Sequence, residues 1–175
     1  MTEDGQALAR HIRDIPDYPK PGVMFRDITP LLGDGPAFAR TVDLLADRFR
    51  DSGIKRVIGI EARGFIVAAP VAYRLGAGFV PVRKAGKLPW AVAREEFDLE
   101  YGSDKLEIHR DALHPDEPVL ILDDVLATGG TAQAAVRLVE GLGARVVGLG
   151  FIIELMALGG RSRLDGHRLE SLVAY

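Results

Sequence analysis

Residues 119–131, VLILDDVLATGGT, join a short apolar run to two adjacent aspartates and then to a glycine-rich segment. The run VLIL has the length and composition of a strand buried on both faces, which is typical of a parallel sheet. Asp123 and Asp124 then fall at the carboxyl end of that strand. Ligands of open parallel sheets collect at the carboxyl ends of the strands. The stretch therefore predicts a ligand site in an α/β fold.

The segment after the aspartates, ATGGT at residues 127–131, has the features of a phosphate cradle. Its two glycines let backbone N–H groups approach an anion, and the hydroxyls of Thr128 and Thr131 can donate hydrogen bonds. A helix predicted to begin near Thr131 adds the favourable dipole of its N-terminus. Carboxylates repel a phosphate, so Asp123 and Asp124 suit a ligand that also carries hydroxyls or a cation. A ribose 5-phosphate meets both requirements.

Either half of this stretch alone would be typical of an ordinary turn with a helix N-cap. The two halves together, between a buried strand and a periodic helix, favour the ligand site. The stretch is not a Walker loop, because no Gly-Lys-Ser/Thr follows the glycines, and the dinucleotide fingerprint G-x-G-x-x-G is absent here.

Similar apolar runs at residues 56–60, 79–82 and 146–153 predict further buried strands, and apolar residues at helical spacing predict helices over 36–50 and 131–142. This alternation predicts an α/β fold with a central parallel sheet. Two regions interrupt it. Residues 14–35 hold four prolines and are predicted to wrap the surface. Residues 83–105 are charged and poorly periodic, and are predicted to form a long functional or mobile loop.

The composition limits the class of protein. A chain of 175 residues fits one domain, and a net charge of -3 argues against a general nucleic-acid binder. There is no cysteine and hence no disulfide or thiolate chemistry. No apolar run approaches the roughly 18 residues that span a bilayer, and the first residues lack a signal-peptide core. We expect a cytoplasmic protein with no membrane or nucleic-acid partner.

The stretch VLILDDVLATGGT resembles the diphosphoribose-binding motif of the type I phosphoribosyltransferases. The segments PGVMFRDITPLL, GIEARGF, FVPVRKAGKLP and FDLEYGSDKLEIH resemble the adenine-specific members of that family, in the same order and spacing. The likeness covers nearly the whole chain. It implies the type I phosphoribosyltransferase fold, a single α/β domain with a central parallel sheet flanked by helices. Residues 1–35 would form a small N-terminal hood that binds the base, and residues 83–105 a flexible catalytic loop.

The resemblance also implies a reaction. Family members transfer the phosphoribosyl group of PRPP to N9 of adenine, giving AMP and pyrophosphate in purine salvage. Mg²⁺ is expected as cofactor, held mainly by substrate and water, because no His/Asp/Glu cluster has the spacing of a protein metal cage. A homodimer is expected, because part of the basic cluster at residues 83–87 reaches the neighbouring subunit's site in related enzymes.

The resemblance assigns roles to individual residues. Glu100 is the expected general acid/base for proton exchange at the purine. Asp123 and Asp124 are expected to bind the ribose hydroxyls, and the residues expected to bind the 5-phosphate are Ala127, Thr128, Gly129, Gly130 and Thr131. The residues expected to bind pyrophosphate are Arg63, Arg83, Lys84 and Lys87. Adenine is expected to contact Met24, Phe25 and Arg26. Families of this type often carry a non-proline cis peptide bond in the pyrophosphate loop, which here would fall at Glu61–Ala62; the sequence does not show whether it is present.

Two alternatives stay open at this point. One is a phosphoribosyltransferase for another base, such as hypoxanthine, guanine or xanthine. The other is a PRPP-sensing regulator that keeps the fold without catalysis. The regulator is less favoured because the chain has no length to spare for a DNA-binding domain and because Glu100 is present.

Overall fold

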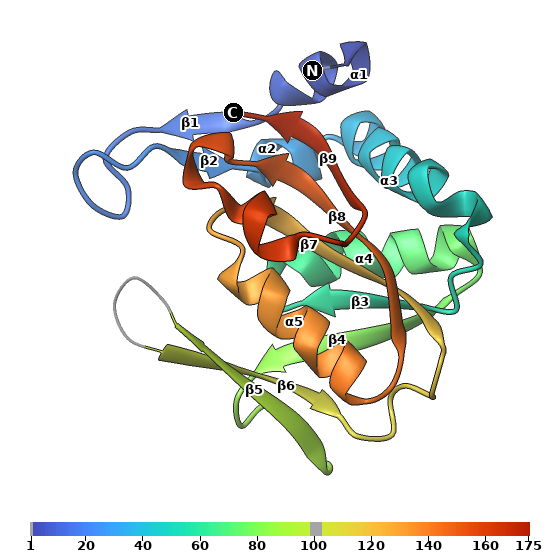
Figure 1. Cartoon of the computed structure of the whole chain (residues 1–175). Coiled ribbons are helices and arrows are strands. Elements are labelled where there is room, and N and C mark those ends of the chain that lie inside the picture. Colours follow the sequence, from blue (N-terminus) through green and yellow to red (C-terminus); the bar gives the residue numbers. More distant parts are fainter. Residues whose placement is uncertain (1, 99–102) are drawn as a thin grey trace.

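The computed structural model describes residues 2–98 and 103–175, and its centre is a sheet with five parallel strands (Figure 1). In spatial order these strands are β4 (Gly78–Lys84), β3 (Arg56–Ile60), β7 (Pro118–Leu126), β8 (Arg145–Glu154) and β9 (Leu169–Ala174). Each neighbouring pair is parallel. The predicted α/β fold with a central parallel sheet is confirmed, and the four predicted strands are β3, β4, β7 and β8.

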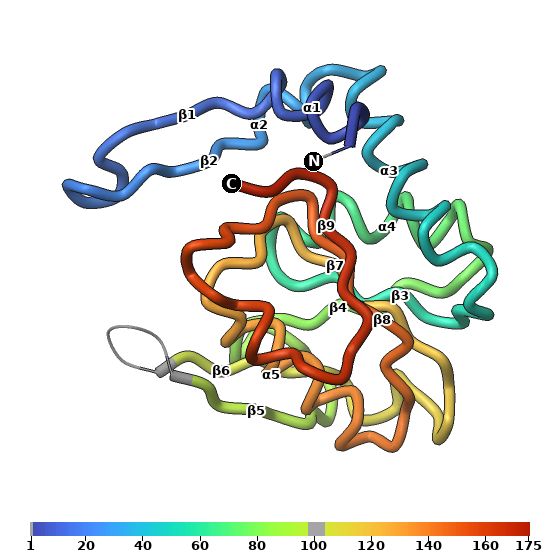
Figure 2. The backbone as a smooth tube through the Cα atoms, turned by 45° about the horizontal axis from the view of Figure 1, so that its top comes forward, coloured from blue at the N-terminus to red at the C-terminus, as the bar shows by residue number. Residues whose placement is uncertain are grey.

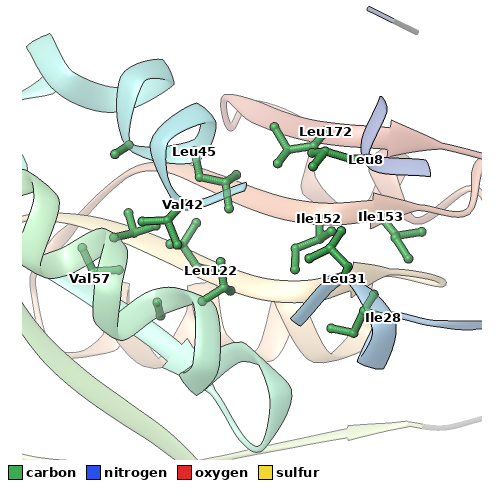
Figure 3. Packing of buried hydrophobic residues seen from close by; sticks show 14 of the residues in the cluster. Leu8, Ile28, Leu31, Val42, Leu45, Val57, Leu122, Ile152, Ile153 and Leu172 are labelled. Carbon is green, nitrogen blue, oxygen red and sulfur yellow. The ribbon is translucent and has the colours of Figure 1, made fainter. Parts of the chain in front are cut away.

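Helices cover both faces of this sheet. Helices α3 (Gly35–Phe49) and α4 (Arg63–Leu75) lie on one face, and α5 (Gly130–Gly141) lies on the other (Figure 1). Successive strand residues point to opposite faces, so Leu120 and Leu122 join the core under α3 and α4, whereas Ile121 joins the core under α5. Figure 3 shows Leu122 packed with Val42 and Leu45 of α3. No helix in the described residues is long and apolar enough to span a membrane.

The hood begins with α1 (Glu3–Ala9) and continues through β1 (Arg13–Ile15), β2 (Phe25–Asp27) and α2 (Thr29–Gly33). Strands β1 and β2 pair in a small antiparallel sheet that lies over the C-terminal end of the chain (Figure 2). The prediction that residues 14–35 only wrap the surface is wrong at Ile28 and Leu31, which are buried in the core (Figure 3). Pro30, one of the four prolines, lies in the first turn of α2, where its fixed φ suits a helix.

A β-hairpin extends the sheet beyond β4. Strands β5 (Val92–Asp98) and β6 (Ser103–His109) are antiparallel, and β6 pairs with β4. The prediction of a loop over residues 83–105 is therefore wrong for residues 83–84, 92–98 and 103–105, which lie in β4, β5 and β6. Phe97, Leu106 and Ile108 join the core beneath α5, but the charged residues between them hid this two-residue period. The predicted mobility of residues 83–105 during function stays a prediction, and so does the extent of the hood over residues 1–35.

Three 3₁₀ helices complete the described elements: η1 (Arg50–Ser52), η2 (Met156–Leu158) and η3 (Gly160–Leu164). The last two join β8 to β9 at the carboxyl end of the sheet. They bring a glycine pair, Gly159 and Gly160, next to the segment that the sequence predicts to hold a phosphate.

Candidate active site

A cavity of about 550 Å³ lies among the hood, the carboxyl ends of β3 and β7, and the β5–β6 hairpin. Its lining includes most of the residues predicted from the sequence: Met24, Phe25, Arg26, Arg63, Lys84, Asp123, Asp124, Ala127 and Thr131. A smaller cavity of about 70 Å³ adjoins it and adds Thr128, Gly129 and Gly130. Arg83 and Lys87 are not among the lining residues of either cavity. Glu100, the predicted acid/base, lies outside the described residues.

Asp123 and Asp124 lie within β7 rather than after it. The strand continues to Leu126, because Asp123 and Val125 still pair with Phe151 and Ile153 of β8 after the apolar run has ended. The boundary predicted at residue 122 is therefore wrong, although the position at the carboxyl end of the sheet is right. Asp124 is buried, with 6% of its surface exposed, and Asp123 lines both cavities.

The two aspartates do not act as two free negative charges. Arg63 Nε donates a hydrogen bond to Asp124 Oδ2 over 2.5 Å. Burial, and secondarily the charge of Asp124, raise the pKa of Asp123 well above its usual range. A neighbouring cation and a tendency to hold a proton both reduce the negative charge of the pair. The repulsion that the sequence predicts between these carboxylates and a nearby phosphate is thereby weakened.

The phosphate cradle is built from backbone packed against backbone. Gly129 has a φ of +82°, and a Cβ there would lie 2.5 Å from the carbonyl oxygen of Gly160. A Cβ on Gly160 would lie 2.2 Å from the carbonyl oxygen of Ala127. Helix α5 begins at Gly130, so the first-turn N–H groups adjoin the small cavity. Backbone donors at a helix N-terminus suit an anionic oxygen ligand.

A further glycine that the sequence analysis did not single out brings α4 against β7. A Cβ on Gly64 would lie 2.8 Å from Asp123 Oδ1 and 3.0 Å from the carbonyl oxygen of Leu122. Only a residue without a side chain lets the start of α4 pass so close to the aspartate. The sequence feature that could have indicated this close approach is the position of Gly64, in the motif EARG directly after a predicted strand. The peptide bond between Glu61 and Ala62 is cis, a feature that the sequence alone does not show.

The predicted cation cluster is organised by Glu61, a residue that the sequence analysis did not nominate. Its carboxylate accepts hydrogen bonds from the Lys84 amide at 3.0 Å, from Arg83 Nε at 3.3 Å, and from Lys87 Nζ. Burial alone would raise the pKa of Glu61, but these donors outweigh it and lower the pKa to about 2. Arg83 and Lys87 are thus held at the edge of the main cavity. Lys84 lines that cavity and pairs through Nζ with Asp104 at 3.0 Å.

The wall formed by residues 23–26 is mostly apolar and carries one aromatic ring. The rings of Phe25 and Tyr18 form a T-shaped pair with their centroids 5.2 Å apart, and the guanidinium carbon of Arg63 lies 5.6 Å from the centroid of the Phe25 ring. Val125 and Leu155 add apolar surface to the same cavity. A flat ring, aliphatic neighbours and nearby main chain are suited to a planar heterocycle.

The donor set of the site suits a magnesium ion bound chiefly by a substrate. Within residues 2–98 and 103–175, no three His, Cys, Asp or Glu side chains are grouped so that they could enclose a metal. Asp123 and Asp124 still provide hard oxygen atoms beside the cradle. Mg²⁺ commonly keeps waters and phosphate oxygens and takes only one or two protein carboxylates.

Comparison with known proteins decides the family. A family model of the phosphoribosyl transferase domain matches residues 32–167. The adenine phosphoribosyltransferase of Acidothermus cellulolyticus is 57% identical over 97% of this chain and 96% of that protein. The chain belongs to the adenine phosphoribosyltransferase family. The relative from Trichormus variabilis, another adenine phosphoribosyltransferase, is 58% identical over 94% of this chain and 96% of its own length.

Solved structures of this family have the same fold. The adenine phosphoribosyltransferase of Thermoanaerobacter pseudethanolicus superposes with a TM-score of 0.95 at 48% identity, covering 98% of this chain and 99% of that one. The Saccharomyces cerevisiae enzyme superposes with a TM-score of 0.92 at 38% identity, covering 98% and 99%. That yeast enzyme was crystallised with adenine and an imino-altritol bisphosphate. The predicted type I phosphoribosyltransferase fold is confirmed.

Proposed function

We propose that the protein transfers the phosphoribosyl group of PRPP to N9 of adenine and releases AMP and pyrophosphate. The observation that carries this proposal is the convergence of three chemically different surfaces on one cavity: the Asp123–Asp124 pair, the phosphate cradle beside it, and the apolar wall at Phe25. A purine ribose phosphate needs these three surfaces, with the ribose-binding pair between the cradle and the apolar wall. The relatives at 54–58% identity, all adenine phosphoribosyltransferases, support the same reaction.

The ribose phosphate is held at its two ends. The 5-phosphate accepts hydrogen bonds from backbone N–H groups of residues 127–131 and from the hydroxyls of Thr128 and Thr131. The ribose hydroxyls donate to the carboxylates of Asp123 and Asp124. Because Arg63 already neutralises Asp124, the carboxylate pair binds the diol with little repulsion of the phosphate. Fixing both ends of the sugar orients its reactive carbon toward the base.

The base lies against Phe25, whose ring provides a stacking surface. Adenine presents an amino donor at N6 and an acceptor at N1, and a backbone C=O and N–H from residues 24–26 match that edge. Hypoxanthine presents the reversed pattern and would leave these buried groups unpaired, which is a strong basis for rejecting it. The Arg26 side chain turns away from this wall toward Asp14 and Tyr175, so it is the main chain of Arg26 that reads the base.

Pyrophosphate leaves next to Lys84, with Arg83 and Lys87 held nearby on Glu61. Positive charge at this edge stabilises the departing anion as the bond from C1 of the ribose to the pyrophosphate oxygen breaks. Mg²⁺ supplies further charge neutralisation when bound. Asp123 and Asp124 would share in holding it, with the substrate phosphates and waters as the other ligands.

Glu100 manages the proton exchange at the purine. As the bond from N9 to C1 of the ribose forms, N9 must lose a proton and N7 gains or shares one. A carboxylate can accept the first proton, and the carboxylic acid so formed can donate the second. Glu100 follows β5 in the chain, the strand that brings Phe97 to the cavity lining, which supports this assignment.

The function is tested by an assay for AMP and pyrophosphate from adenine and PRPP with Mg²⁺. The wild-type protein should be active, Glu100→Gln should lose about 10²–10⁴-fold in kcat while retaining PRPP binding, and Asp123→Asn combined with Asp124→Asn should lose PRPP binding. Activity on hypoxanthine or guanine but not adenine would favour a different base. PRPP binding without turnover of any base would favour a regulator.

The protein acts as a homodimer in the cytoplasm in this proposal. The exposed apolar side chains Ile66, Tyr73 and Phe79, on α4 and β4, support a subunit interface there. Sedimentation equilibrium tests the dimer, and a monomer at micromolar concentration would contradict it. Cell fractionation tests the location.

A further inference from the structure

Tyr175 lies against the hood although the two are at opposite ends of the sequence. Figures 1 and 2 both place the C-terminal end of the chain beside the β1–β2 sheet. The guanidinium carbon of Arg26 lies 3.8 Å from the centroid of the Tyr175 ring, which is the distance of a close cation–π contact. No substrate role accounts for this contact, since Tyr175 does not line the main cavity.

The Arg26 side chain is held from a second direction by Asp14. Arg26 and Asp14 face each other in the register of β1 and β2 and form an ion pair. The Arg26 side chain is only 19% exposed, so its position is set by these neighbours rather than by solvent. A planar guanidinium can stack on a ring and pair with a carboxylate at the same time.

The segment that contains Arg26 borders two cavities. Val23, Met24 and Arg26 line the main cavity of about 550 Å³ and also a second cavity of about 770 Å³ on the side of Tyr175. Most protein segments are located by dense packing on both sides. A segment that borders open volume lacks part of that support, so its position depends on the pairing of β2 with β1 and on the contacts of its own side chains.

Tyr175, by contrast, is attached firmly to the sheet. Its N–H donates to the carbonyl oxygen of Glu154 at 3.0 Å, and its own carbonyl accepts from the Met156 N–H at 2.8 Å. Leu155, which lies between Glu154 and Met156 in the sequence, lines the main cavity. The ring of Tyr175 therefore connects the end of β8 to the hood through Arg26.

We infer that Tyr175 is a positioning residue for the purine, which fixes the main chain of residues 24–26 by stacking on Arg26. The inference rests on the proposed function, in which that main chain reads the edge of adenine. Hydrogen bonds weaken steeply as their geometry departs from linear, so a small shift of residues 24–26 degrades base recognition. The sugar-phosphate contacts, which come from β7 and the start of α5, stay in place.

Steady-state kinetics of Tyr175→Ala test this inference, with Tyr175→Phe as the conservative variant. Tyr175→Ala keeps the main-chain bonds of residue 175 and removes only the ring. We expect a rise of about 5- to 10-fold in the KM for adenine, as for the loss of one partly buried cation–π contact, with the KM for PRPP changed less than about twofold. The preference for adenine over hypoxanthine in kcat/KM should fall. Tyr175→Phe should restore both.

Arg168→Ala supplies a matched control, because it removes another cation–π contact, that of Arg168 over Phe49 at 4.8 Å, outside both cavities. An unchanged KM for adenine in folded Tyr175→Ala would overturn the inference, as would an equal rise in both KM values. If circular dichroism shows that Tyr175→Ala is unfolded, Tyr175→Leu takes its place, because leucine keeps apolar bulk without a π face. The same two KM values then decide the outcome. If the wild type makes no AMP, the proposed function fails and the inference falls with it.

Discussion

Arg63 and Asp124 meet at the floor of the cavity, where Arg63 Nε donates to Asp124 Oδ2 although the two residues are 61 positions apart. The same guanidinium lies 5.6 Å from the ring of Phe25, measured from its central carbon to the ring centroid. Arg63 therefore contacts both the carboxylate proposed to bind ribose and the ring proposed to bind the base. One side chain couples the sugar and base halves of the site.

Removing either partner should impair the other. Arg63→Ala leaves a buried carboxylate without its cation, and Asp124→Ala leaves the guanidinium without its acceptor, so each should lower kcat/KM by at least about tenfold. The loss of kcat/KM in the double variant, expressed as a free energy, should be smaller than the sum of the two single losses by a coupling energy of about 1–3 kcal/mol. The measurement is a double-mutant cycle on kcat/KM for PRPP. Strictly additive losses would mean that the two side chains act independently.

The Glu61 cluster should make stability depend on pH in a defined direction. The folded-state pKa is about 2, below the ordinary value of 4.5, so ionised Glu61 stabilises the fold above about pH 4.5. That contribution is lost as the pH falls from there toward 2. Glu61→Gln should lower the free energy of unfolding at pH 7 by about 1–2 kcal/mol, and by clearly less at pH 3.

Urea unfolding of the wild type and Glu61→Gln at both pH values measures this difference. Asp111→Asn, at an exposed position, controls for the general effect of removing a negative charge. A difference between wild type and Glu61→Gln that is the same at pH 7 and pH 3 would contradict the charge-based account of this cluster.

Asp123 should show the opposite dependence, because its folded-state pKa is raised by burial and by Asp124. An acid that holds its proton more tightly when folded makes the protein less stable as the pH rises from the unfolded pKa through the folded one. Asp123→Asn removes that dependence and still accepts the hydrogen bond that the Asp124 amide donates at 2.9 Å. The variant should therefore be more stable than the wild type at pH 7–8, although it binds PRPP more weakly.

Each kcal/mol gained should raise Tm by about 2–4 °C for a chain of this length. Calorimetry of both proteins from pH 5 to pH 8, together with PRPP titrations, checks both halves of the prediction. A lower Tm for Asp123→Asn across that whole range would show that burial of this carboxylate does not destabilise the free protein.

The backbone packing of the cradle should make Gly129 intolerant of any side chain. Gly129→Ala places a Cβ 2.5 Å from the carbonyl oxygen of Gly160 at a φ of +82°. It should destabilise the fold by about 1–3 kcal/mol and raise the KM for PRPP strongly. Gly141→Ala, at the other end of α5, meets nothing within 4 Å and should be neutral or slightly stabilising. Urea unfolding and PRPP kinetics of the two variants measure these effects. Equal stabilities and equal KM values for PRPP in the two variants would contradict the account.

The sequence predicted the parts of the fold whose signal is local. Strands β3, β4, β7 and β8 are continuous apolar runs, and α3 and α5 carry apolar residues at helical spacing. Helix α4 was not predicted, because RGFIVAAPVAYRL is apolar on nearly every side and contains Pro70. The β5–β6 hairpin was missed because four of the seven residues of β5, VAREEFD, are charged and β6, SDKLEIH, has only two apolar residues. Its strands are identified by the pairing of β5 with β6 and of β6 with β4.

The site was predicted where one segment supplies its chemistry, and missed where the chemistry depends on distant partners. The stretch from Asp123 to Thr131 carries its own signal, and these residues do line the two cavities. The role of Glu61 depends on Arg83 and Lys87, which lie 22 and 26 positions away. The role of Gly64 depends on the close approach of α4 to β7, which no local sequence pattern predicts.

A crystal structure of the protein with AMP tests the central claim most directly. The account predicts the phosphate of AMP within hydrogen-bonding distance of backbone N–H groups of residues 127–131, the ribose hydroxyls on Asp123 and Asp124, and the purine stacked on Phe25. AMP bound at another place on the protein, with this cavity free of nucleotide at saturating concentration, would contradict it.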